Sequence, residues 1–526
     1  MNRLVCILTA GKGTRMGPYA SYLNKATLPI KKKAIISHII EKFPKKTEFI
    51  IGLGFLGDQV RDYLEIAHAD IRFHFIKIDK YEGRGSGPGY SLLQCKDKLK
   101  NPFYFVSCDT LWSNKIDLNA QNNWMGTAQV STKDTQNYCN FKIDAGRIVS
   151  IKDKQKVDPL THEAFVGLCF VKDTDIFFQG LENPSLKTGE VQVSDGIQAL
   201  IDRSTVEARH IDWIDVGDED KYKREVSKYE NYDFSKSNEV LYILNKRVVK
   251  FFAEKSFAEK RVRKASLNPS VFPHIDKYIN NFFSYPFIAG KTLYQSSTFP
   301  TFHKLLTWLD KKLWKKVASV DRQAFQAICK KFYYDKTLER LDLYYRKYSY
   351  VDAKTTINGI KTPKTRELLK QIPWNSMYEG IPSFIHGDLQ FDNILYNHQK
   401  DSFVLLDWRQ DFGGVVEYGD MYYDLAKMWG GIILNYDLIK LNLLKYEEEN
   451  DGIYFDFAQR HLTKNYLQIL EAFIKKKDLS VHKVKMLVGL IYLNMSPLHH
   501  SPFDKMLYSL GRQVLFSTLQ DHGENK

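Results

Sequence analysis

The sequence begins with a short apolar run, LVCILTA (residues 4–10), that passes directly into a glycine-rich turn, GKGTRMG (11–17). An apolar run of this length, bounded by glycine, is typical of a fully buried β-strand. The glycines allow the backbone to turn tightly, so that its N–H groups can point at a phosphate, and the N-terminus of a following helix favours the same negative charge. The pattern therefore predicts an α/β sheet with an anion-binding turn at the end of its first strand.

Up to about residue 228, β-rich runs alternate with helical patterns. Further strands are predicted from TEFIIGLG, IRFHFIKI, PFYFVSCD, AFVGLCFVKD and VEARHIDWIDVG, and helices from IISHIIEKF, GDQVRDYLEIA, GYSLLQCKDKL and VSDGIQALID. This alternation predicts a mostly parallel, doubly wound, Rossmann-like sheet. The polar stretch 220–239 is the best boundary, which gives domains of residues 1–230 and 231–526.

The second domain begins with a β-rich run, VLYILNKRVVKFF (240–252), and continues as a mainly helical sequence. Two strand-like pieces, NILYN (393–397) and FVLLDW (403–408), interrupt the helical part. A small β lobe (about 231–295) followed by a large helical lobe (about 296–526) is the order of bilobal, protein-kinase-like α+β folds.

Composition narrows the classes of function. The formal net charge is +14, but the lysines are scattered and no nucleic-acid-binding module is present, so we expect no nucleic-acid partner. The six cysteines form no CxxC pair, which argues against a zinc site and a disulfide framework. No run approaches 18 apolar residues, so no membrane insertion is expected. These features predict a soluble, cytoplasmic protein.

Several segments of the first domain occur in the order found in one enzyme family. They are LTAGKGTRMG (8–17), NKATLPI (24–30), GSGPGYSLL (85–93), FVSCDTLW, VQVSDGIQAL and WIDVGDEDKY. Together they resemble the sugar-phosphate nucleotidyltransferases, over residues 1–228. Asn24 stands where that family has proline.

The resemblance implies a set of site residues. Lys25 and Arg15 would be catalytic, Asp109 and Asp215 would bind Mg²⁺, and Gly167 and Asp195 would line the pocket of the phosphate monoester. Nucleotide-binding positions would be Leu8, Ala10, Gly11, Lys12, Gly13, Thr14, Gly87 and Gly89. In this chemistry a phosphate monoester attacks the α-phosphorus of a nucleoside triphosphate and expels pyrophosphate, so the site must neutralise two anions.

The helical part carries a second phosphate-transfer motif. HGDLQFDNIL (386–395) fits H-x-D-x-x-x-x-N, and Asp407 follows Asn393 at the end of FVLLDW. The combination resembles the aminoglycoside phosphotransferases and choline kinases. It implies that Asp388 is the catalytic carboxylate and that Asn393 and Asp407 bind Mg²⁺. His386 would shape the loop, and an aspartate of GDMYYDLAKM, Asp420 or Asp424, would brace it.

The small lobe is less typical of that family. RVVKFF resembles the strand that carries the ATP-binding lysine, here Lys250, and Glu259 is either its ion-pair partner or a solvated helix residue. YPFIAGKTL (285–293) resembles the hinge that holds adenine, with Phe287 in it. FSKSNEVLYI (234–243) stands in place of the expected glycine-rich cover loop.

The two activities would act in sequence, because a kinase of this type makes a phosphate monoester and a nucleotidyltransferase of this type consumes one. Fused cytidylyltransferase–choline kinases are similar in domain order, which implies ATP and CTP as nucleotides and a product for capsule or lipopolysaccharide decoration. Alternatives are a sugar kinase joined to a UTP- or GTP-dependent nucleotidyltransferase, a kinase with a vestigial first domain, and a nucleotidyltransferase with a non-catalytic kinase-like module.

The alcohol is indicated only by Arg409, two residues after Asp407. A guanidinium about 4–6 Å from a bound ammonium would repel it by roughly 3–4 kcal/mol at an effective dielectric near 20. Arg409 therefore favours a polyol, sugar or acidic alcohol over choline or ethanolamine. The alternative is that Asp411 or Glu417 holds Arg409 in an ion pair turned away from the acceptor.

Overall fold

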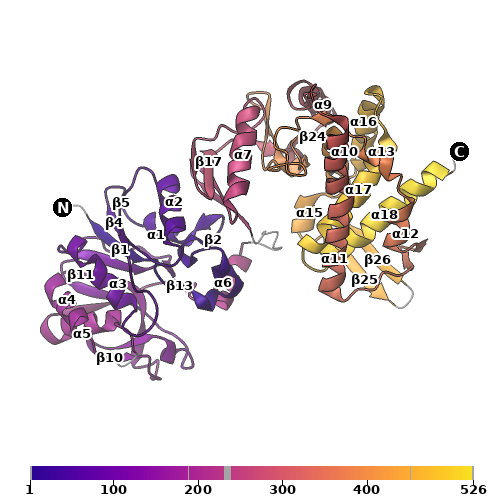
Figure 1. The fold of residues 1–526 in the computed structure, drawn as a ribbon. Coiled ribbons are helices and arrows are strands. Elements are labelled where there is room, and N and C mark those ends of the chain that lie inside the picture. Colours follow the sequence, from indigo (N-terminus) through magenta and orange to yellow (C-terminus); the bar gives the residue numbers. More distant parts are fainter. Residues whose placement is uncertain (1–2, 187–188, 230–237, 450–451, 524–526) are drawn as a thin grey trace. The chain divides into compact units, whose positions relative to one another are not determined.

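A computed structural model describes residues 3–186, 189–229, 238–449 and 452–523. By packing, the described residues form two compact units (Figure 1). The first comprises residues up to 229 together with 238–255 and 277–287, and the second comprises 256–276 and everything from 288 onwards. None of the described helices has both the length and the apolar character that crossing a membrane requires.

The first unit is built on a nine-stranded sheet whose first half is parallel, as predicted. In order across the sheet these parallel strands are β5 (Arg72–Lys77), β4 (Glu48–Leu53), β1 (Leu4–Leu8) and β6 (Phe103–Ser107). The second half is mixed, because β11 (His162–Val171) runs antiparallel to β6. Beyond it lie β8 (Asn123–Ala128), β12 (Val206–His210), β10 (Arg147–Asp153) and β9 (Cys139–Asp144).

Helices cover both faces of this sheet. Val5 and Ile7 of β1 lie in one buried cluster and Cys6 and Leu8 in the other, because successive side chains of a strand point to opposite faces. The covering helices include α1 (Ile35–Ile40), α2 (Gly57–Ala67), α3 (Pro88–Cys95), α4 (Thr174–Glu182) and α5 (Val193–Arg203). A doubly covered sheet explains why β1 is apolar throughout.

An antiparallel four-stranded sheet also belongs to the first unit. Its strands, in spatial order, are β14 (Glu239–Leu244), β15 (Arg247–Phe252), β17 (Phe282–Pro286) and β16 (Lys277–Ile279). We refer to it as the 239–286 sheet. It is the β part of the predicted small lobe, yet it packs with the first unit, whereas the predicted boundary had placed it with the second domain.

The physical reason for this division is a shared core. Tyr242, Phe251 and Phe282 of the 239–286 sheet are fully buried in the same cluster as Tyr63 of α2. The ring centroids of Tyr63 and Tyr242 are 4.8 Å apart. Arg247 also donates a hydrogen bond of 2.8 Å to the carbonyl oxygen of Ile66. The residues around 230, where the boundary was predicted, lie outside the described part of the chain.

The second unit is mainly helical, as predicted. Its helices include α7 (Lys255–Leu267), α9 (Phe299–Lys312), α10 (Arg322–Lys330), α11 (Lys336–Tyr348), α14 (Met421–Ile433), α16 (Thr463–Lys476), α17 (Val481–Met495) and α18 (Phe503–Gly523), drawn from pink through orange to yellow in Figure 1. A hairpin of β22 (Ile394–Asn397) and β23 (Ser402–Leu405) carries the second motif. A separate sheet contains β19 (Thr355–Ile357), β20 (Ile360–Thr362), β25 (Leu444–Glu449) and β26 (Gly452–Phe457).

Candidate active sites

The glycine-rich turn lies between β1 and a 3₁₀ helix, η1 (Thr14–Ser21). Gly13 and Gly17 have φ values of 63° and 55°, a region that favours glycine. Arg15 is exposed on η1 and has no ion pair among the described residues, so its guanidinium is available to an anion. The exposed Lys12 contacts Glu82 at 2.5 Å. The other predicted nucleotide contacts of the turn, Leu8, Ala10, Gly11 and Thr14, remain predictions.

Lys25 lies at the centre of the first site. Its ammonium donates to Asp109 Oδ2 at 2.8 Å and to the carbonyl oxygen of Gly217 at 2.7 Å, and the residue is only 8% exposed. Asn24 fixes the start of this segment by donating to the carbonyl oxygens of Thr9 and Phe55. The departure from the family's proline therefore ties the lysine segment to the end of β1.

The two predicted metal ligands converge. Asp109 precedes β7 (Thr110–Trp112), Asp215 ends β13 (Trp213–Asp215), and the antiparallel register of these strands pairs Asp215 with Thr110. Burial raises the pKa of Asp109, but Lys25 and Arg15 outweigh it and hold that pKa below its ordinary value. The carboxylate is therefore ionised and can bind a cation.

Two residues that the sequence did not single out hold Asp215. The hydroxyl of Tyr138 and the ammonium of Lys221 each donate to Asp215 Oδ2 at 2.7 Å. Lys221 also donates to Tyr138 Oη, so the three side chains form a closed network. Burial raises the pKa of Tyr138 to about 12. Lys221 stands inside the quoted WIDVGDEDKY segment, six positions after Asp215, but a lysine there is indistinguishable from a solvated one by sequence.

Of the remaining predicted residues of the first site, the glycines allow close packing and the aspartate caps a helix. A Cβ at Gly87 or Gly89 would collide with the backbone of residues 191–192, so this loop needs glycine for close packing. Gly167, with φ of 77°, approaches the Ser107 side chain at the end of β6. Asp195 accepts hydrogen bonds from the N–H groups of Ser185 and Gln192, which makes it a cap of α5. Its contact with substrate stays a prediction.

The first site fits a magnesium ion that is shared with the substrate. A Cβ at Gly217 would lie 2.8 Å from Asp215 Oδ1 and 3.6 Å from Asp109 Oδ2, so the glycine leaves open the space where both carboxylates meet. Among the described residues, no cluster of three or more His, Cys, Asp or Glu side chains could hold a metal alone. Mg²⁺ typically takes one or two carboxylates and completes its shell with phosphate and water.

The second motif forms a rigid loop before the β22–β23 hairpin. His386 Nδ1 accepts from the Asp388 N–H at 3.1 Å, and Nε2 lies 2.8 Å from the carbonyl oxygen of Leu406. This pairing requires a neutral ring with its proton on Nε2. Burial lowers the pKa of His386 to about 4, which agrees with the neutral form.

Asp424 braces this loop, and Asp420 does not. The two Asp424 carboxylate oxygens accept the N–H groups of Gly387 and His386 at 2.7 and 2.8 Å, and the Trp314 indole donates to one of them. Burial raises the pKa of Asp424. Asp420 instead accepts from Ile381, from the first turn of α14 and from a tyrosine hydroxyl.

Asp388 is held by side chains from two elements. Lys427 of α14, only 9% exposed in its side chain, forms an ion pair of 2.8 Å with Asp388 Oδ1, and Gln390 donates to the same oxygen. Asn393 donates its amide to the Asp388 carbonyl oxygen at 2.8 Å, which fixes the orientation of the Asn393 side chain. Asp407, which has a left-handed φ of 58°, pairs with Arg261 of α7 at 2.9 Å.

The surroundings of Asn393 and Asp407 also fit Mg²⁺. Oxygen ligands from an asparagine and an aspartate suit this hard cation. In the described part of the chain, Oδ1 of Asp392 is buried without a hydrogen-bond partner. Burial and then the charge of Asp388 raise the pKa of Asp392 to about 6. A cation bound by Asn393 and Asp407 would stabilise the ionised form of this Asp392 carboxylate.

The sequence left open whether Asp411 or Glu417 neutralises Arg409, and the structure pairs both acids with other residues. Asp411 pairs with Lys260 at 2.8 Å, and Glu417 pairs with Arg263. The Arg409 Nε donates to the backbone carbonyl oxygen of Asp411 at 3.1 Å, and Arg409 forms no ion pair with any acid in the described ranges. The alternative of an Arg409 ion pair with Asp411 or Glu417 is therefore wrong.

Lys264 of α7 is a further residue that the sequence analysis missed. Its buried ammonium donates to the carbonyl oxygens of Arg409 (2.9 Å) and His386 (3.4 Å), so it ties the loop of His386 to the segment of Arg409. Burial lowers the pKa of Lys264.

The predicted nucleotide residues of the small lobe lie in different units. Lys250 of β15 pairs with Glu239 of β14 at 2.9 Å, a partner that the sequence analysis did not consider. Glu259 lies on α7 in the second unit, and Phe287 is exposed after β17. The roles of Lys250, Glu259 and Phe287 in nucleotide binding stay predictions.

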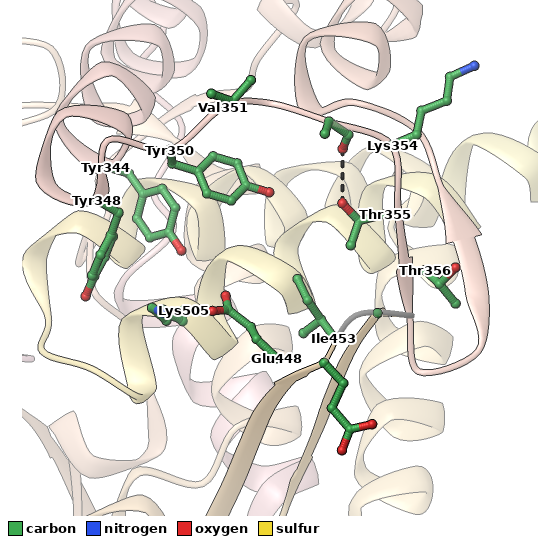
Figure 2. Close-up of a pocket in the computed structure, with 13 residues that line it drawn as sticks. Tyr344, Tyr348, Tyr350, Val351, Lys354, Thr355, Thr356, Glu448, Ile453 and Lys505 are labelled. Atoms are coloured by element: carbon green, nitrogen blue, oxygen red, sulfur yellow. Dashed lines mark hydrogen bonds and ion pairs between the residues drawn. The ribbon is translucent and has the colours of Figure 1, made fainter.

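A pocket of about 580 Å³ lies at the far end of α11 (Figure 2). Tyr344, Tyr348 and Tyr350 line it together with Glu448 and Lys505, which form an ion pair of 3.0 Å. Lys336 is the first residue of α11 and Tyr348 is the last, so the two lie roughly 18 Å apart along the helix axis. The pocket is therefore separate from the end of α11 that carries Lys336.

Comparison with known families matches each half separately. Residues 5–120 match the MobA-like NTP transferase domain, a range that includes the glycine turn, Lys25 and Asp109. Residues 285–441 match the phosphotransferase enzyme family, a range that includes Asp388, Asn393, Asp407 and Asp424. Asp215 and the first strands of the 239–286 sheet lie outside both matches.

Curated relatives match only the first part of the chain. The bifunctional protein GlmU of Methanococcus maripaludis is 29% identical over 222 residues, which is 40% of this chain and 50% of the relative. The protein of the same name from Methanocaldococcus jannaschii is 26% identical over 218 residues, with the same coverage. The chain thus spans about half the length of the curated relatives it matches.

Solved structures also match the first part. UDP-glucose pyrophosphorylase complexed with UDP-glucose is 18% identical and covers 44% of this chain and 98% of its own, with a TM-score of 0.37. CTP:phosphocholine cytidylyltransferase from Streptococcus pneumoniae is 21% identical and covers 42% and 97%, with a TM-score of 0.34. The chain therefore carries one segment similar to the MobA-like NTP transferase domain and a second segment similar to the phosphotransferase enzyme family.

Proposed function

We propose that this chain phosphorylates a small alcohol with ATP and then couples the product to a nucleotide, with CTP as the donor. The observation that carries the proposal is that one chain holds both residue sets, Lys25–Asp109–Asp215 and Asp388–Asn393–Asp407, each assembled at one place in its own unit. The product of the second set is the class of substrate that the first set consumes.

In the kinase step, the hydroxyl oxygen of the alcohol attacks the γ-phosphorus of ATP. The bond from that phosphorus to the β,γ-bridging oxygen breaks, ADP leaves, and the hydroxyl proton passes to the Asp388 carboxylate. Lys427 and Gln390 orient this carboxylate. Mg²⁺ would be held by Asn393 and Asp407, where it would neutralise charge on the phosphates.

In the nucleotidyl step, a phosphate oxygen of the monoester attacks the α-phosphorus of the triphosphate. The bond to the α,β-bridging oxygen breaks and pyrophosphate leaves, giving a nucleoside diphosphate ester of the alcohol. Lys25 and Arg15 stabilise the anionic groups, and Asp109 and Asp215 would hold Mg²⁺, which would neutralise charge on the α-phosphate.

The choice of CTP and of a surface glycan as destination rests on the resemblance to fused cytidylyltransferase–choline kinases. A cytoplasmic location is supported by the absence of disulfides, since all six cysteines are free.

The direct test is incubation of the full chain with Mg²⁺, ATP, a panel of alcohols and each of CTP, UTP and GTP in turn. Mass spectrometry should detect the phosphate monoester with ATP alone and the cytidine diphosphate ester when CTP is added. A chain that makes the monoester but couples it to none of the triphosphates would contradict the two-step proposal.

A further inference from the structure

Cationic side chains from three parts of the second unit lie near Asp388, and a fourth follows on one of the helices. Lys427 of α14 pairs with it directly. Lys336 begins α11, with its ammonium 4.1 Å from the centre of the Phe332 ring, and the Arg409 guanidinium carbon lies 5.0 Å from the same ring centre. Arg340 lies one turn after Lys336 on α11, where residues i and i+4 are neighbours.

Arg409 also packs against the catalytic loop itself. A Cβ placed on Gly387, the residue before Asp388, would lie only 2.6 Å from the Arg409 Cβ. The backbone N–H of Arg409 donates to the carbonyl oxygen of His386 at 3.0 Å. This bond fixes the start of the Arg409 side chain beside that loop. Arg409 therefore belongs to the site at Asp388.

These charges act on one another. Burial, followed by the charges of Arg409, Lys427 and Arg340, lowers the pKa of Lys336, and Asp388 acts in the opposite direction. Burial and then Arg409 lower the pKa of Arg340, and Glu339 acts in the opposite direction. The neighbouring acids Asp335 and Asp342 pair with Lys330 and Arg366, and among the described residues Lys336 and Arg340 form no ion pair. The acids near Arg409 are engaged by Lys260 and Arg263.

Such an arrangement is unfavourable unless an anion completes it, because unpaired, partly buried cations repel one another and lose hydration. The phosphates of ATP do not account for all four cations. The Mg²⁺ that accompanies these phosphates would be held by Asn393 and Asp407, which lie on the side of the β22–β23 hairpin. Lys336, Arg340 and Lys427 come from helices α11 and α14 instead.

We propose that the alcohol phosphorylated at Asp388 carries an anionic group, a carboxylate or a phosphate, which Lys336, Arg340 and Arg409 bind. This inference rests on the proposed kinase activity and narrows its acceptor. It excludes choline and ethanolamine, whose ammonium groups would meet the same three cations. Lys427 stays on Asp388 and orients it towards the hydroxyl group.

The test compares acceptors that share a three-carbon chain and differ in the terminal group and its charge: 3-hydroxypropionate, 3-hydroxypropionamide, 1,3-propanediol and 3-amino-1-propanol, together with 3-hydroxypropyl phosphate. With the full chain, ATP and Mg²⁺, kcat/KM should be at least tenfold higher for an anionic acceptor than for the amide or the diol. It should be more than a hundredfold higher than for the ammonium alcohol. A neutral or ammonium alcohol as the best acceptor would overturn the inference while leaving the kinase activity standing.

Variants separate acceptor binding from binding of ATP. Arg340→Gln and Lys336→Gln should raise KM for the anionic acceptor tenfold or more, with KM for ATP little changed, and Arg340→Glu should shift the preference towards the ammonium alcohol. Arg346→Gln, on the exposed face of the same helix, is the matched control. If Arg340→Gln raised KM for ATP and left the discrimination among acceptors intact, the cations would serve the nucleotide and the inference would fail.

A binding measurement covers the case in which none of the acceptors is turned over. By calorimetry, 3-hydroxypropionate or 3-hydroxypropyl phosphate should bind the unmodified chain and lose at least tenfold in affinity in the Lys336→Gln/Arg340→Gln double variant, but not in Arg346→Gln. Binding without turnover would count against the proposed kinase function alone. Equal binding by the double variant and the unmodified chain would overturn the anion site.

Discussion

The hydroxyl of Tyr242 donates a hydrogen bond of 2.8 Å to the carbonyl oxygen of Thr27. Thr27 lies in the short segment that carries Lys25, and Tyr242 lies on β14, next to the strand that carries Lys250. The sheet predicted to bind ATP is thus packed directly on the segment that carries Lys25, inside one core.

Loss of this hydrogen bond should destabilise the first unit. Tyr242→Phe leaves a buried carbonyl oxygen without its donor, so we expect a loss of about 1–2 kcal/mol in the free energy of unfolding. The shift of the urea midpoint measures it, with Tyr90→Phe as control because the Tyr90 hydroxyl bonds to Asp79 at the surface. Equal midpoints for Tyr242→Phe and Tyr90→Phe would show that the contact contributes nothing.

The catalytic steps should nevertheless be chemically separable. Asp109→Ala removes a predicted metal ligand of the first unit, so pyrophosphate release should stop while ATP-dependent phosphorylation of the alcohol continues. Assays of both products on the purified variant check this. Loss of both activities, with the circular dichroism spectrum unchanged, would mean that the two sites depend on each other.

Asp388→Asn keeps the size of the side chain and removes its charge. We expect phosphorylation to slow by roughly 10²-fold or more, because the group that accepts the hydroxyl proton is lost. Nucleotidyl transfer to a supplied phosphate monoester should survive. Asp478→Asn, at an exposed left-handed position, is the matched control. A turnover close to that of the unmodified enzyme would remove Asp388 from its catalytic role.

Lys221 should act as a positioning residue for Asp215. Lys221→Gln breaks the ion pair and the link to Tyr138, and loss of such an outer partner of a metal ligand typically costs about 10–100-fold. We expect a loss of this size in nucleotidyl transfer and a raised Mg²⁺ requirement, with phosphorylation unchanged. Lys223→Gln, on the same helix but paired with Glu219 at the surface, should have no effect.

His386 should make stability depend on pH below 6.5. Its pKa is about 4 in the folded protein against 6.5 ordinarily, so the unfolded chain binds more protons between these values. The stability that the neutral His386 ring contributes is fully present above pH 6.5. It is lost as the pH falls through 4, by up to about 3 kcal/mol in total.

His386→Gln isolates this contribution. The raised pKa of Asp424 acts in the opposite direction in part of the same range, but it is common to both proteins. Between pH 7 and pH 5, the unfolding midpoint of the unmodified second unit should fall further than that of the variant. Parallel pH profiles would refute a buried neutral histidine.

Features that depend on residues close together in the sequence were mostly predicted. The strand–glycine turn, the convergence of Asp109 and Asp215, and the brace at Asp424 follow from motifs whose backbone geometry is fixed by neighbouring residues. Lysines with internal partners were missed, since the half-buried Lys221 and the buried Lys264 and Lys427 have no pattern that separates them from the solvated lysines around them. The place of the 239–286 sheet was also missed, because its partner, α2, lies far away in sequence.

The shared core has a consequence for dividing the chain into two separately expressed pieces. Two pieces stay dispersed in water only as long as each keeps its own polar surface. Here Tyr63, Tyr242 and Phe282 are buried against one another, and a split between residues 229 and 238 would expose them on both pieces. We therefore expect the two pieces to aggregate or to reassociate when they are made apart, so a truncation series should keep the 239–286 sheet with the first unit.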